Sequence, residues 1–293
     1  MAAQGRAPRT PLNVRMMGVV SLLTDASSEM VYPVLPLFLT NVLGAPVAAI
    51  GLIESLAEAG AAFMKLGSGW FSDRVGRRKP LVALGGTLSH LVKPVLALTQ
   101  SWPAVLALRV TDRLGKGVRT APRDALIADS VDPSIKGRAY GFHRAMDYSG
   151  ALIGVAVCYF LSLAYLDPVT KTITDIDAFY KLFLISLVPA FIGVVMLLLV
   201  REKRPDRAEG ARQPVSFSLS GLDGRLKLFF VAVFIFTLGN SSNQFLLLKS
   251  MDAGVGLPDM LLMYMVFNLV TSALSTPLGG LSDRIGRTRI ILA

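Results

Sequence analysis

Two pairs of carboxylates stand four residues apart within otherwise apolar stretches of the sequence. Asp25 and Glu29 form the first pair, and Glu54 and Glu58 form the second. Because residues four apart lie on one face of a helix, each pair predicts a carboxylate stripe on a helical face. Carboxylates in apolar surroundings either pair with bases or bind and release protons, so both kinds of chemistry are candidates here.

Charged residues that match these acids follow in two later apolar stretches. Bases on one predicted helical face are Arg109, Arg113 and Lys116, with Asp112 and Arg119 on a neighbouring face, and the next stretch adds Arg144 and Asp147. The spacing of three and four residues keeps the bases aligned along a helix. Together with the two carboxylate pairs they form one candidate set for ion pairing and proton coupling.

The composition indicates that these charges lie inside a membrane protein. The 293-residue chain is 53% hydrophobic and only 17% charged, with a mean hydropathy of +0.55. Apolar runs lie near 14–40, 46–71, 80–100, 103–130, 137–166, 179–201, 226–249 and 258–282, and a ninth begins near 288. A bilayer is crossed by about 20 mostly apolar residues, so the sequence predicts an all-α, polytopic membrane protein with eight spans.

The connections between these runs alternate in charge. Basic residues precede the first run and follow the second, fourth, sixth and eighth, whereas the other connections are short and neutral or carry acids. The positive-inside rule therefore predicts a multi-pass protein of the cell (inner or plasma) membrane with a cytoplasmic N-terminus. This topology accounts for the net charge of +10, so nucleic-acid binding is not expected. The first run is also too long for a signal peptide.

Charged residues of different predicted spans lie at similar depths in the membrane. At ~1.5 Å per residue from the cytoplasmic ends, one group lies at roughly 15–17 Å and a second at roughly 20–24 Å. The first group is Asp25, Arg119 and Asp147, and the second is Glu29, Glu58, Lys116 and Arg113. Because unpaired intramembrane charges are costly, we predict a ladder of charges that lines a cavity. Structural salt bridges and a proton carrier both explain it, with Asp25 and Glu29 as the leading carriers, beside a bend predicted at Pro33 and Pro36.

A charged turn occurs twice in the chain. Residues 69–79, GWFSDRVGRRK, follow the second run, and residues 279–289, GGLSDRIGRTR, follow the eighth. Both resemble the signature loop of the major facilitator superfamily, which lies between helices 2 and 3 and again between helices 8 and 9. Arg109, followed by Gly115 and Gly117, resembles the family's helix-4 motif, although Asp112 adds a charge where many members are neutral.

The resemblance implies the fold of that superfamily and a division of the chain. Residues 1–200 would form an N-terminal six-helix transmembrane bundle, 201–225 a cytoplasmic linker, and 226–293 the start of a C-terminal bundle. The linker is also predicted by its charged, Gly- and Pro-rich composition. Because the family normally has twelve helices, the resemblance implies a chain truncated at the beginning of helix 9, with a fragment more expected than an eight-helix protein.

The two loops also have an expected mechanical role. Glycines allow close helix approach and tight turns, and the resemblance implies that the acid and bases latch the two halves together on the cytoplasmic side during alternating access. The expected latch residues are Gly69, Asp73, Arg74, Gly76, Arg77, Arg78, Gly279, Asp283, Arg284, Gly286 and Arg287. A role of the bases in topology alone is the simpler alternative.

Other polar residues in the apolar runs give weaker signals. The candidates for a substrate wall in spans 7 and 8 are Asn240, Asn243, Gln244 and Asn268, and polar contact between helices explains them equally well. His90 and His143 are too far apart to predict a metal site, and His143 fits a solvated residue near the inner end of its span. We expect no metal and no cofactor, and we expect Cys158 to be a packing residue.

The combined pattern predicts a secondary active transporter rather than an enzyme. It would move a small solute by alternating access, with proton coupling, and efflux is one expected direction. The alternatives are an uptake permease for a polar or ionic metabolite, and a non-transporting membrane fragment or scaffold. Residues 115–117, GKG, lack the rest of a phosphate-binding loop, which argues against an ATP-driven pump. The expected partners are a small-molecule substrate, protons and the lipid bilayer, and the chain is expected to be a monomer.

Overall fold

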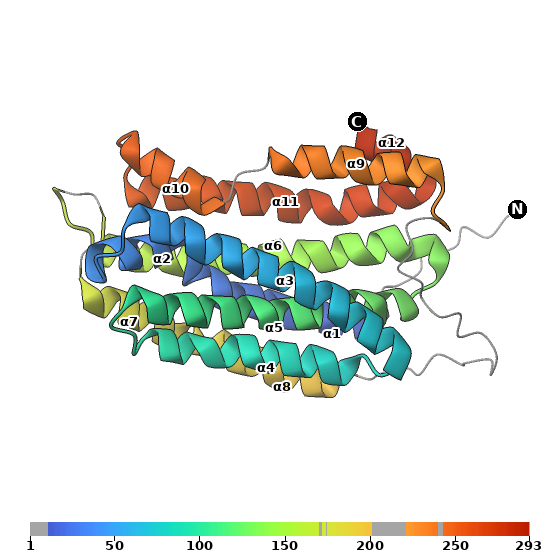
Figure 1. The fold of residues 1–293 in the computed structure, drawn as a ribbon, viewed down its shortest axis with the longest axis horizontal. Coiled ribbons are helices and arrows are strands. Elements are labelled where there is room, and N and C mark those ends of the chain that lie inside the picture. The colour runs from blue at the N-terminus through green and yellow to red at the C-terminus, as the bar shows by residue number, and fades with distance from the viewer. Residues whose placement is uncertain (1–10, 170–171, 174, 201–220, 240–242, 293) are drawn as a thin grey trace, which may run out of the picture.

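Helices make up nearly all of the structure, which is a computed structural model that describes residues 11–169, 172, 173, 175–200, 221–239 and 243–292. Figure 1 shows long helices that run side by side along one direction. Within the described residues, the only pairing of extended backbone is an isolated bridge between Leu166 and Ile173. The all-α fold that the sequence predicts is therefore correct.

The helices coincide with the predicted apolar runs. The first four runs hold α1 (Leu12–Glu29), η1 (Tyr32–Val34), α2 (Leu35–Leu37), η2 (Phe38–Val42), α3 (Val47–Val75), α4 (Lys79–Leu96) and α5 (Trp102–Asp129). The later runs hold η3 (Pro133–Ile135), α6 (Lys136–Ala164), α7 (Ile176–Ile185), α8 (Leu187–Leu199), α9 (Gly224–Leu238), α10 (Asn243–Asp252), α11 (Leu257–Ile285) and α12 (Arg287–Leu292). Most of the predicted linker lies outside the described residues, so the division into two bundles stays a prediction.

Four helical stretches in the described part of the chain are long and apolar enough to cross a membrane by length and composition alone. They are Val47–Val75, Pro133–Ala164, Ile176–Leu199 and Leu257–Ile285. The other predicted spans are interrupted or rich in polar residues: the first is broken after Glu29, and α5 carries most of the candidate bases. The four stretches therefore include α3 and α6 with their candidate charges, but not α1 or α5.

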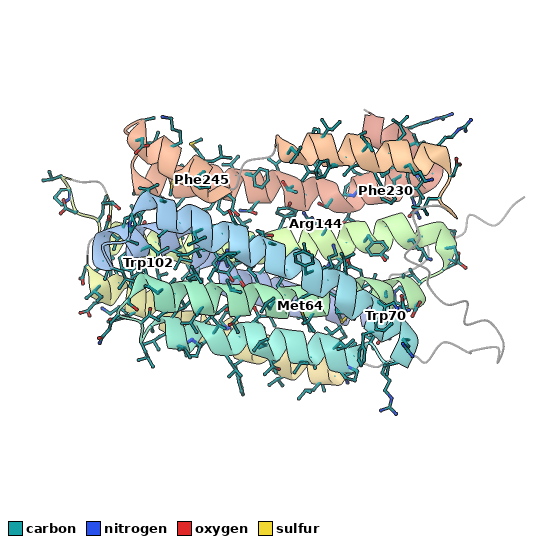
Figure 2. The ribbon with its side chains drawn as sticks, viewed as in Figure 1. Met64, Trp70, Trp102, Arg144, Phe230 and Phe245 are labelled. Atoms are coloured by element: carbon teal, nitrogen blue, oxygen red, sulfur yellow. The ribbon has the colours of Figure 1, made fainter. Side chains whose placement is uncertain are left out.

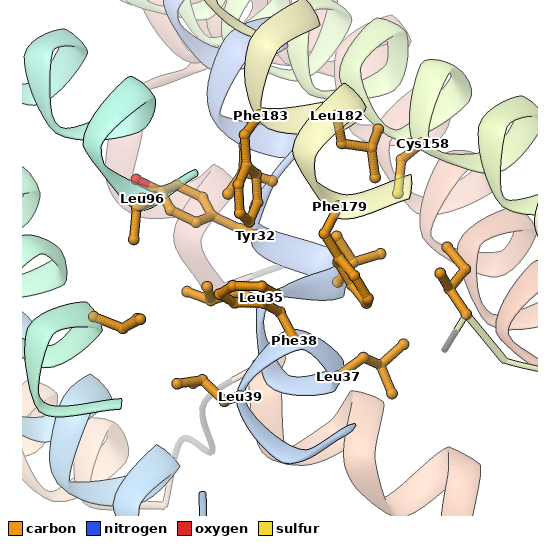
Figure 3. Close-up of a cluster of buried hydrophobic side chains, with 14 of the residues drawn as sticks. Tyr32, Leu35, Leu37, Phe38, Leu39, Leu96, Cys158, Phe179, Leu182 and Phe183 are labelled. Carbon is orange, nitrogen blue, oxygen red and sulfur yellow. The ribbon is translucent and has the colours of Figure 1, made fainter. Parts of the chain in front are cut away.

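The first span is irregular where its prolines predicted a bend. The α-helix ends at Glu29, a 3₁₀ turn begins at Tyr32, and a π-helical turn follows a short α-helical segment. Proline supplies no backbone donor, so the regular α-helical hydrogen-bond ladder is lost at this position. The irregular segment is held by packing, because the ring of Phe38 lies 5.3 Å from the rings of both Phe179 and Phe183 (Figure 3).

Small residues bring α1 and α6 into close contact. A Cβ atom at Gly150 would lie 2.1 Å from the carbonyl oxygen of Leu22, and one at Gly154 would lie 2.4 Å from that of Ala26. These distances are shorter than van der Waals contact, so only glycine fits at either position. The close approach fixes the charged face of α1 beside α5 and α6.

Candidate functional site

Among the residues that the structure describes, Arg109 on α5 is the most deeply buried charged residue. Its side chain is 1% exposed, and its Nε and Nη2 atoms donate to the two carboxylate oxygens of Glu54 on α3, at 3.0 and 3.4 Å. Its Nη1 atom donates to Asp112, one turn along α5, at 3.2 Å. The two-pronged contact with Glu54 matches the planar geometry of arginine.

Asp112 joins this pair to two further helical segments. It accepts hydrogen bonds from the hydroxyls of Tyr32, in the irregular segment after α1, and Ser89 on α4. The ring of Tyr32 lies under the guanidinium of Arg109, at 3.8 Å from the guanidinium carbon to the ring centre. Acid, base and hydroxyl groups are thus satisfied together, as buried polar groups require.

The Arg109–Glu54 pair is the first rung, or ion pair, of the predicted ladder of charges. A second rung lies one turn further along both helices. Arg113 on α5 approaches Glu58 on α3 at 3.3 Å, and its guanidinium carbon is 5.2 Å from the ring centre of Tyr32. The side chain of Glu58 is 62% exposed, against 9% for Glu54. The two rungs therefore have the same spacing, but the acid of the second is far less covered by protein than that of the first.

The predicted level nearer the cytoplasmic ends, that of Asp25, Arg119 and Asp147, is only partly paired. Asp147 on α6 accepts a hydrogen bond from Ser21 on α1 and lies 3.5 Å from Nδ1 of His143. Asp25 and Arg119 are electrostatic neighbours, but neither side chain makes a hydrogen bond or ion pair within the described part of the chain. His143 is 4% exposed, so the prediction of a solvated histidine is wrong; its spacing of four residues from Asp147 was the overlooked signal.

Glu29, the last residue of α1, contacts α11. One carboxylate oxygen accepts a hydrogen bond of 3.3 Å from the hydroxyl of Tyr264, and its electrostatic neighbours include Lys116 and Arg113. No base in the described residues forms a direct ion pair with Glu29. Glu29 and Asp25 thus differ from the acids that have a fixed arginine partner.

Aromatic side chains extend this site between α6 and α11. The rings of Tyr264 and Phe267 stack with centres 6.2 Å apart, and the ring of Tyr148 meets Phe267 edge-on at 6.0 Å. Arg144, labelled in Figure 2, is exposed and donates to the hydroxyl of Tyr148 at 3.0 Å. This surface combines a cation with aromatic faces.

The predicted substrate wall receives little structural support. Asn268 on α11 is 1% exposed, and its amide donates to the carbonyl of Tyr264 at 2.8 Å. This local bond explains the residue without a substrate. Asn240 and the side chains of Asn243 and Gln244 lie outside the described residues.

Lys93 on α4 was not among the predicted site residues. Its side chain is 2% exposed, and its ammonium donates to Ser27 and Ser28 on α1. A lysine directly before a proline in an apolar run, here Lys93 and Pro94, is the signal in the sequence that would have found it.

The first signature loop closes on its own half of the chain. Arg78 lies 3.4 Å from Asp73 and also pairs with Asp129 at the end of α5. Gly76 ends α3 in the left-handed region, with φ 70°, where residues other than glycine are strained. Gly69 lies close to α5, since its Cβ would be 3.2 Å from that of Ala121.

The second signature loop meets a different helix. Both carboxylate oxygens of Asp283, at the end of α11, accept backbone N–H bonds of 2.8 Å from Gly137 and Arg138 at the start of α6. A carboxylate at a helix N-terminus satisfies free N–H groups and the helix dipole. The helices approach closely here, because a Cβ at Gly279 would lie 2.4 Å from the carbonyl oxygen of Gly137. The other loop residues, Arg74, Arg77, Arg284, Gly286 and Arg287, lie beside these contacts in the sequence.

The comparisons with known proteins agree with this arrangement. The family model "Major Facilitator Superfamily" matches residues 17–293. An uncharacterized MFS-type transporter of Methanocaldococcus jannaschii is 33% identical over 289 residues, which cover 95% of this chain and 68% of that protein. A probable 4-methylmuconolactone transporter of Cupriavidus pinatubonensis is 29% identical over 188 residues, covering 64% of this chain and 42% of that protein.

A likeness in three dimensions extends over most of the chain. The crystal structure of a D-xylose–proton symporter superposes with a TM-score of 0.64 at 17% identity, covering 90% of this chain and 67% of that chain. At this identity the likeness concerns the fold, which is the fold that the duplicated signature loop implied.

Proposed function

This chain belongs to the major facilitator superfamily, and we propose that it carries out proton-coupled secondary transport of a small solute by alternating access. The family consists of multi-pass membrane transporters rather than enzymes, so the chemistry of its charged residues is binding and proton exchange. The cell membrane and a cytoplasmic N-terminus are part of the proposal and rest on the distribution of Lys and Arg.

The contrast between paired and unpaired carboxylates carries the proposal. Glu54, Glu58 and Asp112 each contact an arginine, whereas Glu29 has only the hydroxyl of Tyr264 and Asp25 has no direct partner in the described residues. An acid that is held by a fixed base keeps its charge, while an acid without one can be neutralised by a proton. We therefore assign proton exchange to Asp25 and Glu29, and structural roles to the three paired acids.

The solute that we propose is small, polar or anionic, and able to contact aromatic rings. Arg144 is exposed and has no carboxylate partner in the described residues, and Tyr148 and Phe267 present rings beside it. The names of two similar proteins, a 4-methylmuconolactone transporter and a D-xylose–proton symporter, supply probes of this kind. Efflux of amphipathic compounds is the second candidate, which the exposed aromatic surface favours.

Transport in proteoliposomes tests the proposal. Full-length protein would be reconstituted and given radiolabelled 4-methylmuconolactone or D-xylose, with pH gradients imposed in either direction. We expect Glu29→Gln and Asp25→Asn to lose most of the stimulation by the pH gradient, whereas Glu58→Gln, whose acid is paired and exposed, keeps most of it.

Two outcomes would contradict the proposal. If both carrier variants respond to the gradient as the unmodified protein does, the assignment of Asp25 and Glu29 is wrong. If no solute moves with either gradient, including an amphipathic dye as an efflux probe, the chain is better explained as a membrane scaffold.

A further inference from the structure

Lys93 is buried in the bundle without an acid to neutralise it. It is 2% exposed and one of the largest fully buried side chains, together with Arg109. Arg109 has two carboxylate partners, whereas no carboxylate within the described residues forms an ion pair with Lys93. Buried lysines are rare unless they are paired, and charges inside a membrane are retained where they serve function.

The partners of Lys93 are two serine hydroxyls that can only accept from it. The hydroxyl of Ser27 donates to the carbonyl of Ser186 at 2.6 Å, and that of Ser28 donates to the carbonyl of Thr24 at 3.0 Å. A hydroxyl has one proton to donate, so both serine oxygens present lone pairs to the lysine. The site therefore offers two acceptors and no donor to Nζ.

Two acceptors satisfy every N–H group of the neutral amine and all but one of the ammonium. A neutral lysine amine has two N–H groups, which the two serines satisfy, and a lone pair that is free to take a proton. An ammonium has three N–H groups, and the third finds no partner in the described residues. The geometry thus holds Lys93 in place in both protonation states.

Charges of both signs surround Lys93. From α5, Asp112, Lys116 and Arg119 face it; from α1, Asp25 does; and α4 itself contributes His90, one turn away. The break between α7 and α8 contributes only the carbonyl of Ser186 to this contact. Asp112 already accepts from Arg109, Tyr32 and Ser89, so no acid holds the Lys93 proton by direct contact.

A small cavity with a mostly apolar lining lies one turn of α4 before Lys93, which does not line it. It is formed by α1, α4, α5 and α8, and its lining includes Ser21, His90, Arg119 and Arg123. The Nδ1 atom of His90 and the Nε atom of Arg119 have no hydrogen-bond partner among the described residues, although both side chains are more than nine-tenths buried. Buried polar atoms that lack a protein partner are the setting in which internal water is found.

From this arrangement we propose that Lys93 is a proton-binding site of the transporter, in addition to the carboxylates of α1. The lone pair of Nζ takes a proton from a hydronium ion, forming an N–H bond and leaving water. Release returns the proton to water and restores the amine. The proposal that Lys93 binds a proton depends only on the contacts described here. The proposal that this proton is used in coupled transport rests on the proposed function.

The site also lies beside two helix breaks and a proline within a continuous helix. Ser27 and Ser28 immediately precede the end of α1 at Glu29, Pro94 follows Lys93 within α4, and Ser186 separates α7 from α8. Movement at any of these breaks changes the distance between Nζ and the serine oxygens. The protonation state of Lys93 is thereby linked to the position of α1.

Nitrogen NMR of the lysine side chains tests the proposal without a substrate. Full-length protein labelled with ¹⁵Nζ-lysine would be placed in lipid nanodiscs and titrated from about pH 6 to about pH 9, below the range in which ordinary lysines lose a proton. The Lys93 resonance would be assigned by its loss in Lys93→Arg, with Lys65→Arg, an exposed lysine of α3, as the matched control. Ser28→Ala would confirm the assignment by shifting the same signal if Lys93→Arg does not fold.

We expect the Lys93 resonance to move from the ammonium to the amine position within that range. A resonance that stays at one position throughout overturns the proposal, whatever the transport assays show. If Lys93 titrates and Glu29→Gln and Asp25→Asn are unaffected in transport, proton binding at Lys93 stands and the carboxylate assignment fails. If Lys93 does not titrate and the carboxylate variants lose coupling, the reverse holds.

Discussion

The acids of this chain are distinguished at the residue scale by the partners that they have. Glu54 and Glu58 occupy equivalent positions on α3, and each contacts an arginine of α5, but only the first pair is removed from solvent. Breaking a buried pair leaves an uncompensated charge in a low-dielectric environment, whereas an exposed pair is screened by water. The two arginine–glutamate ion pairs are therefore expected to contribute different amounts to the free energy of unfolding.

Double-mutant cycles on the two rungs measure this difference. For Arg109→Gln with Glu54→Gln we expect a coupling energy of about 2–3 kcal/mol in the free energy of unfolding. For Arg113→Gln with Glu58→Gln we expect less than about 1 kcal/mol. Denaturant unfolding in detergent gives both values, and equal coupling at the two rungs would refute the argument from burial.

The residues of the charged set could be predicted from the sequence, but not all of their partners. A spacing of four residues placed Glu54 and Glu58 on one face, and depth counting placed Arg113 at the level of Glu58. The Arg109–Glu54 contact did not follow from that count. Tyr32 and Ser89 were not predicted because hydroxyls are common in helices and give no periodic signal. Lys93 was missed because a single charge in an apolar run has no spacing pattern.

At the scale of elements, the helices could be predicted from the sequence more fully than the partners of the charged side chains. All eight apolar runs are helical in the described residues, since each is long, apolar and bounded by polar or glycine-rich connections. The interruption near Pro33 was predictable because proline removes a backbone donor. The break at Ser186 has the same signal, because Pro189 has no N–H for the carbonyl of Ile185 and its ring crowds that carbonyl.

The contact between α1 and α6 gives a prediction about elements. Gly150→Ala would place a Cβ atom 2.1 Å from the carbonyl oxygen of Leu22, so α1 must move away. We expect a loss of about 1–3 kcal/mol in the free energy of unfolding, the usual cost of overpacking. Gly193→Ala is the matched control, because its nearest neighbour would be 3.4 Å away, and it should change stability by less than about 1 kcal/mol. Similar losses in both variants would contradict the close-packing argument.

At the scale of the whole molecule, the two signature loops are alike in sequence and different in contacts. Asp73 lies near Arg78 in its own loop, whereas Asp283 joins the end of α11 to the start of α6. Segments more than 140 residues apart in sequence are thus linked by backbone hydrogen bonds to one carboxylate. A latch was expected from the resemblance, but its attachment to the N-terminus of α6 depends on tertiary packing that no sequence pattern reports.

The asymmetry between the loops predicts unequal effects of equivalent substitutions. Asp283→Asn keeps the shape of the side chain but removes the charge that binds the N–H groups of Gly137 and Arg138, which weakens hydrogen bonds of the charge-assisted kind. Spin labels at Ser134 and Thr288, both exposed, should then report a broader and longer distance distribution by pulsed electron resonance. Asp73→Asn should leave that distribution close to the unmodified one, because Asp73 contacts its own loop. An equal response to both substitutions would show that the two loops hold this end of the helices jointly, and the assignment of the α6–α11 contact to Asp283 would be wrong.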